Sequence, residues 1–545
     1  RNIAIIAHVD HGKTTLVDKL LQQSGTLTGD IQDRVMDSHD LERERGITIL
    51  AKNTALHWRD YRINIVDTPG HADFGGEVER ILSMVDSVVL LVDAVEGPMP
   101  QTRFVTQKAF AAGLSPLVVI NKIDRPGAKP DQVLNQVFDL FDSLGANETQ
   151  LDFPVVYASG LNGFACLDPA TPGDDLTALF EALVAHTPPP AVEAEAPLQM
   201  QISTLDYSTY VGTIGIGRIR RGTIRPGMSV AVVSADGSVR KAKILQVLGY
   251  LGLQRTPVEQ ASAGDIVAIS GVSELAISDT LCDPEHPAAL PALYVDEPTV
   301  HMRFKVNDSP FSGQEGQYLT SRQIRDRLLR ECSYNVALRV ADTTDPDSFE
   351  VYARGELQLS ILLETLRREG FELAVSRPQV VQKEIDGVTN EPYERLVIDI
   401  PVEKQGDIMP ALGERGGVLS ELVPLGIDRV QLTYIIPARG LIGFHTECLT
   451  LSSGTAIMHH VFEKFAPIKG EARSKTRSYG VLIANSSGKA TPYALWNLQD
   501  RGRLFIGPRV PVYEGMIVGR HNRDNDLVVN ITREKQLTNI RAAGS

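Results

Sequence analysis

The stretch Ala7-His-Val-Asp-His-Gly-Lys-Thr-Thr15 has the residue types and spacing of a phosphate-binding loop. It follows an apolar run, residues 3–6, that predicts a buried strand, and precedes residues 16–21, whose apolar positions fall on one helical face. In that context, loop N–H groups and the helix N-terminus attract phosphate oxygens. Lys13 would supply charge for the β- and γ-phosphates, and the Thr14 hydroxyl a ligand for Mg²⁺. Ala7 replaces the usual first glycine, so the loop alone does not exclude an ordinary turn.

Two further strand ends carry residues that suit a nucleoside triphosphate. Residues 63–67 end at Asp67, where phosphoryl-transfer enzymes place a carboxylate near Mg²⁺. The strand at 117–120 leads into Asn121-Lys-Ile-Asp124, where a carboxylate can accept two hydrogen bonds from the guanine N1–H and exocyclic amine. Adenine lacks this donor pair, so the motif selects the base.

A fourth strand, residues 155–158, ends in Ser159-Gly-Leu161, a turn that can close over the base. Each motif alone has a plain structural explanation, because strands often end in Asp or Asn at turns. All four occur in order with short helix-like spacers, at the carboxyl ends of strands where parallel sheets bind ligands. Together they indicate a GTPase.

Two segments between these motifs have the positions of nucleotide-sensing switches. The charged run at 42–45 leads into Gly46-Ile-Thr-Ile49, and Thr48 would be the ligand that orders this segment on the γ-phosphate and Mg²⁺. His71 follows Asp67-Thr-Pro-Gly70, where many GTPases place a glutamine that orients the attacking water. A lone histidine is more often structural, but this position makes His71 the candidate catalytic residue. Val9 and Ile47 could flank it.

Composition limits the remaining possibilities. A chain of 545 residues forms several domains, because single cores rarely exceed about 250–300 residues. No apolar run approaches the roughly 18–20 residues of a membrane helix, and the early strand leaves no signal-peptide pattern. The four cysteines lie far apart without metal-binding spacing, which favours a reducing cytoplasm and no structural zinc. Because Arg1 is not Met, we expect a few residues to be missing.

Charge is distributed unevenly along the chain. The net charge is −14, yet residues 458–545 hold 14 Lys or Arg against 7 Asp or Glu. This asymmetry suggests a tail that faces nucleic acid on an acidic body, although a basic solvated surface would give the same count. Residues 469–477 alone contain four cations, and Lys489, Arg501 and Arg503 lie near Tyr493 and Trp496. Cations and aromatics together are typical of RNA contact, unless Trp496 belongs to a core.

The pattern of elements predicts a multi-domain α/β and β protein. We expect a P-loop domain with a parallel sheet and helices on both faces, then a β-barrel, two ferredoxin-like α+β domains and a β-rich C-terminal domain. Pro-rich segments separate several of these units. The glycines at 212, 215 and 217 lie in a strand-like run and predict close backbone packing. The predicted domains span residues 1–190, 198–284, 297–376, 392–470 and 471–545.

The four motifs resemble those of translational GTPases, the group of elongation factors G and Tu. Gly355-Glu-Leu-Gln-Leu359 is similar to a segment of the third domain of elongation factor G, and the long fourth domain of that factor is absent. The tail, with Leu495-Trp-Asn-Leu-Gln499 and Asp524-Asn-Asp-Leu527, resembles the BipA (TypA) family. The resemblance covers essentially the whole chain.

This resemblance implies a set of nucleotide-binding residues. The phosphate positions are Asp10, His11, Gly12, Lys13, Thr14 and Thr15. The guanine positions are Asn121, Lys122 and Asp124, and the closing turn is Ser159 and Gly160, with Gly160 departing from the family's Ser-Ala. Thr14 and Thr48 match Mg²⁺ ligands, Asp67 and Gly70 belong to the second switch, and His71 matches the catalytic histidine.

The resemblance also implies partners and a cellular role. It implies a monomeric cytoplasmic factor that hydrolyses GTP to GDP on the ribosome (70S or large subunit, with ribosomal RNA and A-site tRNA as contacts) and is associated with stress adaptation and large-subunit maturation. No obvious arginine finger occurs in the sequence, so we expect the ribosome to complete the site and intrinsic hydrolysis to be slow. One alternative is a nucleotide-gated assembly factor in which hydrolysis only drives release. Another is an elongation-factor-like translocase, against which the missing fourth domain argues.

Overall fold

The structure of the chain is a computed structural model. It describes residues 1–8, 10–26, 40–45, 48–49, 51–69, 75–208, 210–293, 297–335, 337–425, 428–469 and 479–535. The chain divides into two compact units, residues 1–307 with 315–468, and residues 308–314 with 469–545. Among the helices of the described residues, none is long and apolar enough to cross a membrane.

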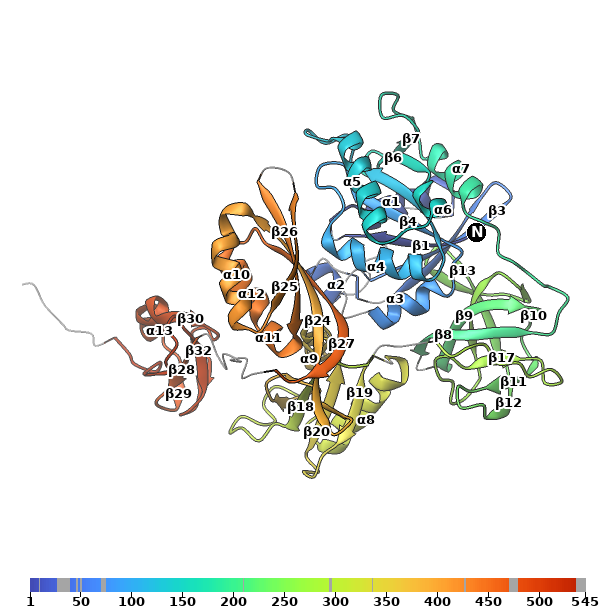
Figure 1. Cartoon of the computed structure of the whole chain (residues 1–545). Coiled ribbons are helices and arrows are strands. Elements are labelled where there is room, and N and C mark those ends of the chain that lie inside the picture. Colours follow the sequence, from blue (N-terminus) through green and yellow to red (C-terminus); the bar gives the residue numbers. More distant parts are fainter. Residues whose placement is uncertain are drawn as a thin grey trace, which may run out of the picture. The chain divides into compact units, whose positions relative to one another are not determined.

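A seven-stranded sheet forms the centre of the first domain (Figure 1). Its inner strands are parallel, whereas both edge strands pair antiparallel to their neighbours. The edge strand β2 is joined to β3 by the turn Arg59-Asp60, and so short a connection permits only an antiparallel pair. The expected parallel sheet is therefore present with two antiparallel edges. The strand order is β2 (Lys52–Trp58), β3 (Tyr61–Asp67), β1 (Asn2–Ala7), β4 (Ser87–Asp93), β5 (Ser115–Asn121), β6 (Val155–Ser159) and β7 (Phe164–Cys166).

Helices cover both faces of this sheet, because its inner strands are apolar on both sides. Ile3 and Ile5 of β1 pack toward α1 and α7, whereas Ala4 and Ile6 pack toward α3, α4 and α5. This alternation separates two apolar cores and leaves the carboxyl edge of the sheet for loops. The helices are α1 (Lys13–Gln23), α2 (Asp40–Arg45), α3 (Gly75–Leu82), α4 (Pro100–Ala111), α5 (Pro130–Ser143), α6 (Glu148–Leu151) and α7 (Thr177–His186).

The second domain is an antiparallel β structure around one apolar core. In β9, a Cβ atom on Gly217 would lie 1.9 Å from the Gln201 carbonyl oxygen, so the predicted close backbone packing is confirmed there. Gly215 is crowded by side chains instead, and Gly212 has nothing within 4 Å, so the prediction is wrong for Gly212. A short sheet pairs β10 (Thr223–Ile224) with β15 (Ala261–Ser262). The main sheet has the order β12 (Val239–Lys243), β11 (Ser229–Val233), β17 (Thr280–Cys282), β8 (Gln199–Ser208), β9 (Gly212–Arg221), β16 (Ile266–Ser270), β13 (Gln246–Leu251) and β14 (Gln254–Pro257).

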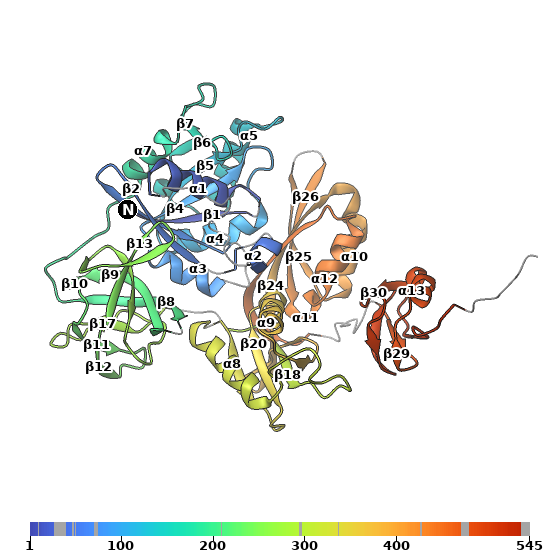
Figure 2. The same ribbon diagram turned by 180° about the vertical axis from the view of Figure 1, so that it is seen from behind.

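The third domain places two helices on one face of an antiparallel sheet (Figure 2). Its strand order, β19-β20-β18-β21, puts the first and third strands in the middle, as a split βαβ pattern requires. The elements are β18 (Val300–Val306), α8 (Ser321–Tyr334), β19 (Arg339–Asp342), β20 (Ser348–Ala353), α9 (Glu356–Arg368), β21 (Leu373–Val375) and β22 (Gln379–Val380).

The fourth domain repeats this arrangement with longer strands. The helices α11 and α12 are separated at Gly443, whose φ of 71° favours glycine. The strand β25 was not predicted from the sequence, because its described residues are exposed and give no alternation of buried and exposed positions. The elements are β23 (Lys383–Ile385), β24 (Val388–Pro401), η2 (Val402–Lys404), α10 (Gln405–Glu414), β25 (Val418–Leu425), β26 (Arg429–Pro437), α11 (Ala438–Leu441), α12 (Phe444–Leu451) and β27 (Ile457–Pro467).

The described part of the C-terminal domain contains a small sheet, β30-β32-β28-β33, a paired β29 and β31, and the helix α13, which the sequence pattern did not predict. That helix, α13, carries Trp496 at its surface with 73% of the residue exposed, so Trp496 is not part of the core. The elements are β28 (Val481–Ala484), β29 (Gly488–Lys489), α13 (Pro492–Leu498), η3 (Gln499–Arg501), β30 (Gly502–Leu504), β31 (Pro511–Val512), β32 (Ile517–His521) and β33 (Leu527–Val529).

Candidate nucleotide site

The phosphate loop connects β1 to α1, and two of its described residues have left-handed backbone. Asp10 has a φ of 64° and Gly12 a φ of 89°, and α1 begins immediately afterwards at Lys13. A Cβ atom on Gly12 would lie 2.6 Å from the Asn121 amide nitrogen, so only glycine fits without a shift of that side chain. The loop thus turns the chain sharply against β5 and directs the first N–H groups of α1 toward the carboxyl edge of the sheet.

Three side chains from separate segments converge beside this loop. The Lys13 ammonium lies 2.5 Å from the Asp67 Oδ1 atom, donates to the Thr48 hydroxyl at 2.5 Å, and lies 3.3 Å from the Thr68 carbonyl oxygen. The Thr48 hydroxyl also lies 3.5 Å from Asp67 Oδ2. Burial raises the pKa of Asp67, and the ammonium of Lys13 opposes that rise. A buried carboxylate, a hydroxyl and a cation therefore meet at one point.

The guanine motif is joined to the phosphate loop by side-chain hydrogen bonds. Asn121 is buried, and its amide nitrogen donates to the His11 carbonyl oxygen at 2.8 Å. Its amide oxygen accepts from the Gly160 N–H at 2.9 Å. Lys122, with a φ of 62°, donates to the Asp10 carbonyl oxygen, and Asp124 is exposed at the same edge. One strand end thus positions three of the predicted loops.

The closing turn is compact. The Ser159 side chain is buried, and its hydroxyl accepts from the Asn162 N–H at 3.2 Å. A Cβ atom on Gly160 would make ordinary contacts at 3.5 Å, with Asn121 and Leu16. The departure from Ser-Ala therefore leaves room for the methyl group that the family pattern contains.

His11 is buried and makes contacts inside the domain. Its Nδ1 atom lies 3.3 Å from the Leu91 carbonyl oxygen, and its Nε2 atom lies 3.6 Å from Glu96. Burial lowers the pKa of His11 to about 4, so the ring is neutral at pH 7.

Thr14 and Thr15 lie in the first turn of α1, with Thr15 exposed. Gly70 and His71, like Val9 and Ile47, lie outside the described residues.

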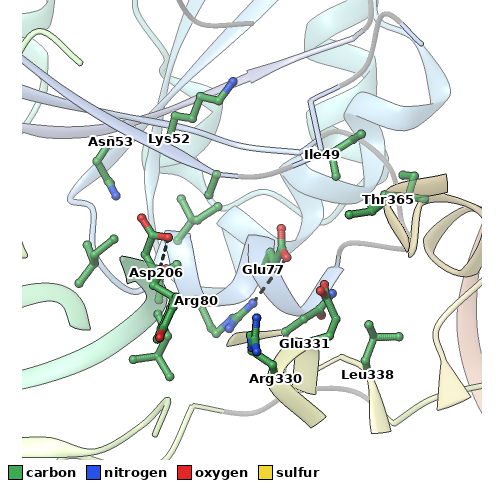
Figure 3. A pocket seen from close by; sticks show the side chains of 18 of the residues that line it. Ile49, Lys52, Asn53, Glu77, Arg80, Asp206, Arg330, Glu331, Leu338 and Thr365 are labelled. Carbon is green, nitrogen blue, oxygen red and sulfur yellow. Dashed lines mark hydrogen bonds and ion pairs between the residues drawn. The ribbon is translucent and has the colours of Figure 1, made fainter. Parts of the chain in front are cut away.

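The structure also shows two features that sequence analysis missed. Asp93, at the end of β4, is fully buried and contacts Lys122 of the guanine motif. A cavity of about 870 Å³ lies where α3, α8 and α9 approach the barrel strand β8, and Figure 3 shows its polar side chains. Glu77 and Arg80 of α3 form an ion pair at 3.9 Å there, and burial raises the pKa of Glu77 to about 7. A sequence motif could not reveal a cavity made by separate domains.

Comparison with known proteins agrees with this geometry. Residues 1–189 match the family model described as the elongation factor Tu GTP binding domain, and residues 212–282 match elongation factor Tu domain 2. Residues 388–476 match the elongation factor G C-terminus, and residues 479–545 match the TypA/BipA C-terminal domain. The fold and these matches define a translational GTPase, an enzyme that binds guanine nucleotide and hydrolyses GTP.

Full-length relatives identify the family within this class. The chain is 62% identical to the "Large ribosomal subunit assembly factor BipA" of Haemophilus influenzae, covering all of this chain and 89% of that protein. It is 61% identical to the protein of the same name in Escherichia coli strain K12, with 100% and 90% coverage. The chain belongs to the BipA family.

A solved structure shows the same fold at low sequence identity. A protein of Thermus thermophilus superposes with a TM-score of 0.61 over 87% of this chain and 98% of that chain, at 16% identity. This likeness concerns the fold alone.

The two glycines that face Asn121 give a matched test of the site. Gly12→Ala should weaken both GDP and GTP binding by about tenfold or more, because left-handed backbone and a clash with Asn121 each cost on the order of 1 kcal/mol. Gly160→Ala should bind both nucleotides as the wild type does, because its methyl group makes ordinary contacts. Nucleotide titration by fluorescence or calorimetry measures both. Equal affinities for the two variants would contradict the described loop geometry.

Proposed function

We propose that this GTPase acts in the assembly of the large ribosomal subunit and that the ribosomal particle accelerates its GTP hydrolysis. The observation that carries the proposal is the identity of 61–62%, over the whole chain, with proteins named for that role. The fold supplies a nucleotide domain followed by modules that match elongation factor domains known from the family models. From the family resemblance we also propose a cytoplasmic, monomeric factor that takes part in stress adaptation and contacts ribosomal RNA and A-site tRNA. The proposed domain boundaries are residues 1–190, 198–284, 297–376, 392–470 and 471–545.

The nucleotide contacts follow from the loops at the sheet edge. Phosphates would bind the N–H groups and side chains of the phosphate loop. The base would bind between the guanine motif and the closing turn. These proposed residues are Asp10, His11, Gly12, Lys13, Thr14, Thr15, Asn121, Lys122, Asp124, Ser159 and Gly160. The buried His11 side chain supports this site through packing rather than through charge, because the ring is neutral.

The oxygen atoms around Lys13 also fit a magnesium ion. Thr48, Asp67 and the first turn of α1 supply hydroxyl and carboxylate oxygens, the donors that Mg²⁺ prefers, and Lys13 already places positive charge among them. Thr14 and Thr48 would hold the ion, with Asp67 behind them. When bound, Mg²⁺ neutralises phosphate charge. The Lys13 ammonium would bind and orient the phosphate oxygens. The Thr48 hydroxyl would make the position of its switch segment depend on whether these phosphates are bound.

Hydrolysis needs a group that orients water, and His71 is the proposed one. Its place in the sequence, directly after Gly70 in the second switch, supports this role. The buried pair Glu77–Arg80 lies on α3, which begins four residues after His71 at Gly75. Because α3 also lines the cavity formed with residues of the second and third domains, we propose that a particle bound to those domains acts on hydrolysis through α3.

A histidine substitution tests the proposed chemistry and separates it from binding. His71→Ala should keep GTP affinity and particle binding, while stimulated turnover falls on the order of 10²-fold because a group that orients water or moves a proton is lost. His57→Ala, which removes an exposed histidine of the same domain, serves as the control. Single-turnover assays with radiolabelled GTP measure both. If stimulated turnover of His71→Ala stays within about threefold of wild type, His71 is not catalytic.

The same variant separates the two candidate roles in cells. We expect cells that contain only His71→Ala to accumulate incomplete large subunits on sucrose gradients, as cells without the protein should. Normal subunit profiles would favour the alternative in which GTP binding suffices and hydrolysis only drives release.

The C-terminal domain is the proposed RNA contact. Among its described residues, Lys489, Arg501 and Arg503 are exposed, as is Trp496, which offers an aromatic face for stacking. Lys469 is the first of the four cations in residues 469–477, and the other three, Arg473, Lys475 and Arg477, lie outside the described residues. This surface supports contact with phosphates through local charge, despite the acidic whole chain.

Charge removal tests this surface against a charge-matched control. Neutralising Lys489, Arg501 and Arg503 to Ala should weaken ribosome binding and flatten the plot of log affinity against log salt, by just under one unit for each lost phosphate contact. The control removes Arg59, Lys129 and Arg322, three exposed cations of other domains. Sedimentation binding over a salt series measures the slopes. Equal slopes for both triple variants would show that only net charge matters and that this domain makes no RNA contact.

A further inference from the structure

Asp93 is the last residue of strand β4, and its carboxylate contacts both the turn that follows β4 and the guanine motif. The residue is fully buried. Its Oδ1 atom accepts from the Val95 N–H at 2.7 Å and lies 3.4 Å from the Glu96 N–H, which fixes the turn after the strand. Its Oδ2 atom lies 2.7 Å from the Lys122 ammonium. Burial would raise the pKa of Asp93, but the hydrogen bonds from Lys122 and the backbone outweigh it and lower that pKa. The carboxylate is therefore ionised and paired.

The Lys122 ammonium lies between Asp93 and the phosphate loop. It donates to the carbonyl oxygen of Asp10 while it contacts the Asp93 carboxylate. The Lys122 backbone has a φ of 62°, a conformation that costs a non-glycine residue free energy and so needs support from its surroundings. The Lys122 Cε atom would lie 3.7 Å from a Cβ atom on Gly12, so the side chain runs along the phosphate loop.

The turn after Asp93 touches the same loops through its backbone. The Ala94 N–H donates to the Asn121 carbonyl oxygen at 2.8 Å, and the Gly97 N–H donates to the Asp93 carbonyl oxygen at 2.9 Å. Within that turn, Glu96 lies 3.6 Å from His11. The end of β4 thus contacts the guanine motif on one side and the phosphate loop on the other.

We propose that Asp93 is a positioning residue for guanine nucleotide binding, whose carboxylate holds the Lys122 ammonium against the phosphate loop. The inference rests on the proposed guanine-binding role of Lys122 and adds a residue that lies outside the nucleotide motifs of the sequence. Because the pair lies on the side of the base motif, it acts on GDP and GTP alike. The competing explanation is that Asp93 only caps the turn after β4.

Asp93→Asn separates these two explanations. The asparagine keeps an oxygen that accepts from the Val95 N–H, so the cap remains, but its amide then turns N–H donors toward the Lys122 ammonium. We expect GDP and GTP affinity to fall together by about ten- to hundredfold, the usual loss for a hydrogen bond to a charged group. The rate of hydrolysis at saturating GTP should stay within about twofold of wild type, because the substitution does not touch the γ-phosphate side. Arg125→Ala, which removes the half-exposed second cation 3.6 Å from Asp93, is the control and should bind both nucleotides normally.

A double-mutant cycle supplies a readout that a purely structural role would not move. Lys122→Met removes the cation of the same pair. The nucleotide affinity of this variant can be measured even if Asp93→Asn fails to fold. In the Lys122→Met background, Asp93→Asn should cause no further loss of nucleotide affinity. A loss of the same size in both backgrounds, or wild-type affinity in Asp93→Asn, would overturn the inference.

Asp124→Asn distinguishes failure of this inference from failure of the proposed site. The guanine site predicts that this variant binds GTP weakly and prefers xanthosine triphosphate, whose added carbonyl suits an amide donor. If Asp124→Asn behaves so while Asp93→Asn binds normally, the guanine site stands and Asp93 has no positioning role. If Asp124→Asn keeps full GTP affinity, the proposed base site is itself wrong, and the inference fails with it.

Discussion

The Asn121 side chain holds the nucleotide site together. One buried amide bonds the phosphate loop at His11 and the closing turn at Gly160, while its backbone carbonyl accepts from the turn after β4. These loops follow the neighbouring strands β1, β4, β5 and β6, and they meet at one edge of the sheet because these four strands are parallel. A site of this kind depends on strand register, since Asp93 pairs with Asn121 and Asn121 with Ala158. The left-handed residues Asp10 and Lys122 are strained positions whose cost the rest of the sheet offsets, whereas Gly12 adopts its left-handed backbone without strain.

A second group of contacts connects the γ-phosphate side to the rest of the chain. The Thr48 and Asp67 side chains both contact the Lys13 ammonium. Ile49, which follows Thr48 in the chain, is buried together with Leu41 against Ile361 of α9. Arg368 of the same helix pairs with Glu44 of α2. The third domain therefore packs directly on the segment that contains the proposed magnesium ligand. A nucleotide-dependent change in that segment must alter these contacts, because close-packed interfaces do not deform continuously.

Sequence predicted the parts of the site that are encoded locally. The phosphate loop, Asp67 and Asn121 follow apolar strands within a few residues, so chain order alone placed them at one sheet edge. Asp93 was missed because its partner, Lys122, is distant in the sequence and the spacing of the two carries no pattern. The exposed strand β25 was missed because it lacks the alternation of buried and exposed residues by which a strand is recognised. The antiparallel edge β2 follows from the short turn that joins it to β3, a local signal that the prediction of a parallel sheet did not use. Trp496 is the clearest example of what the sequence alone does not decide, because only the structure shows that this tryptophan lies at the surface and not in a core.

The most direct test of the central claim is GTP turnover by the full chain, titrated in parallel with purified large subunits, small subunits and assembled ribosomes. The account predicts slow hydrolysis by the protein alone, strong acceleration by particles that contain the large subunit, and no acceleration of a Lys13→Ala variant that removes the phosphate-binding cation. Turnover that is the same with and without large subunits would contradict a GTPase whose site is completed on that particle.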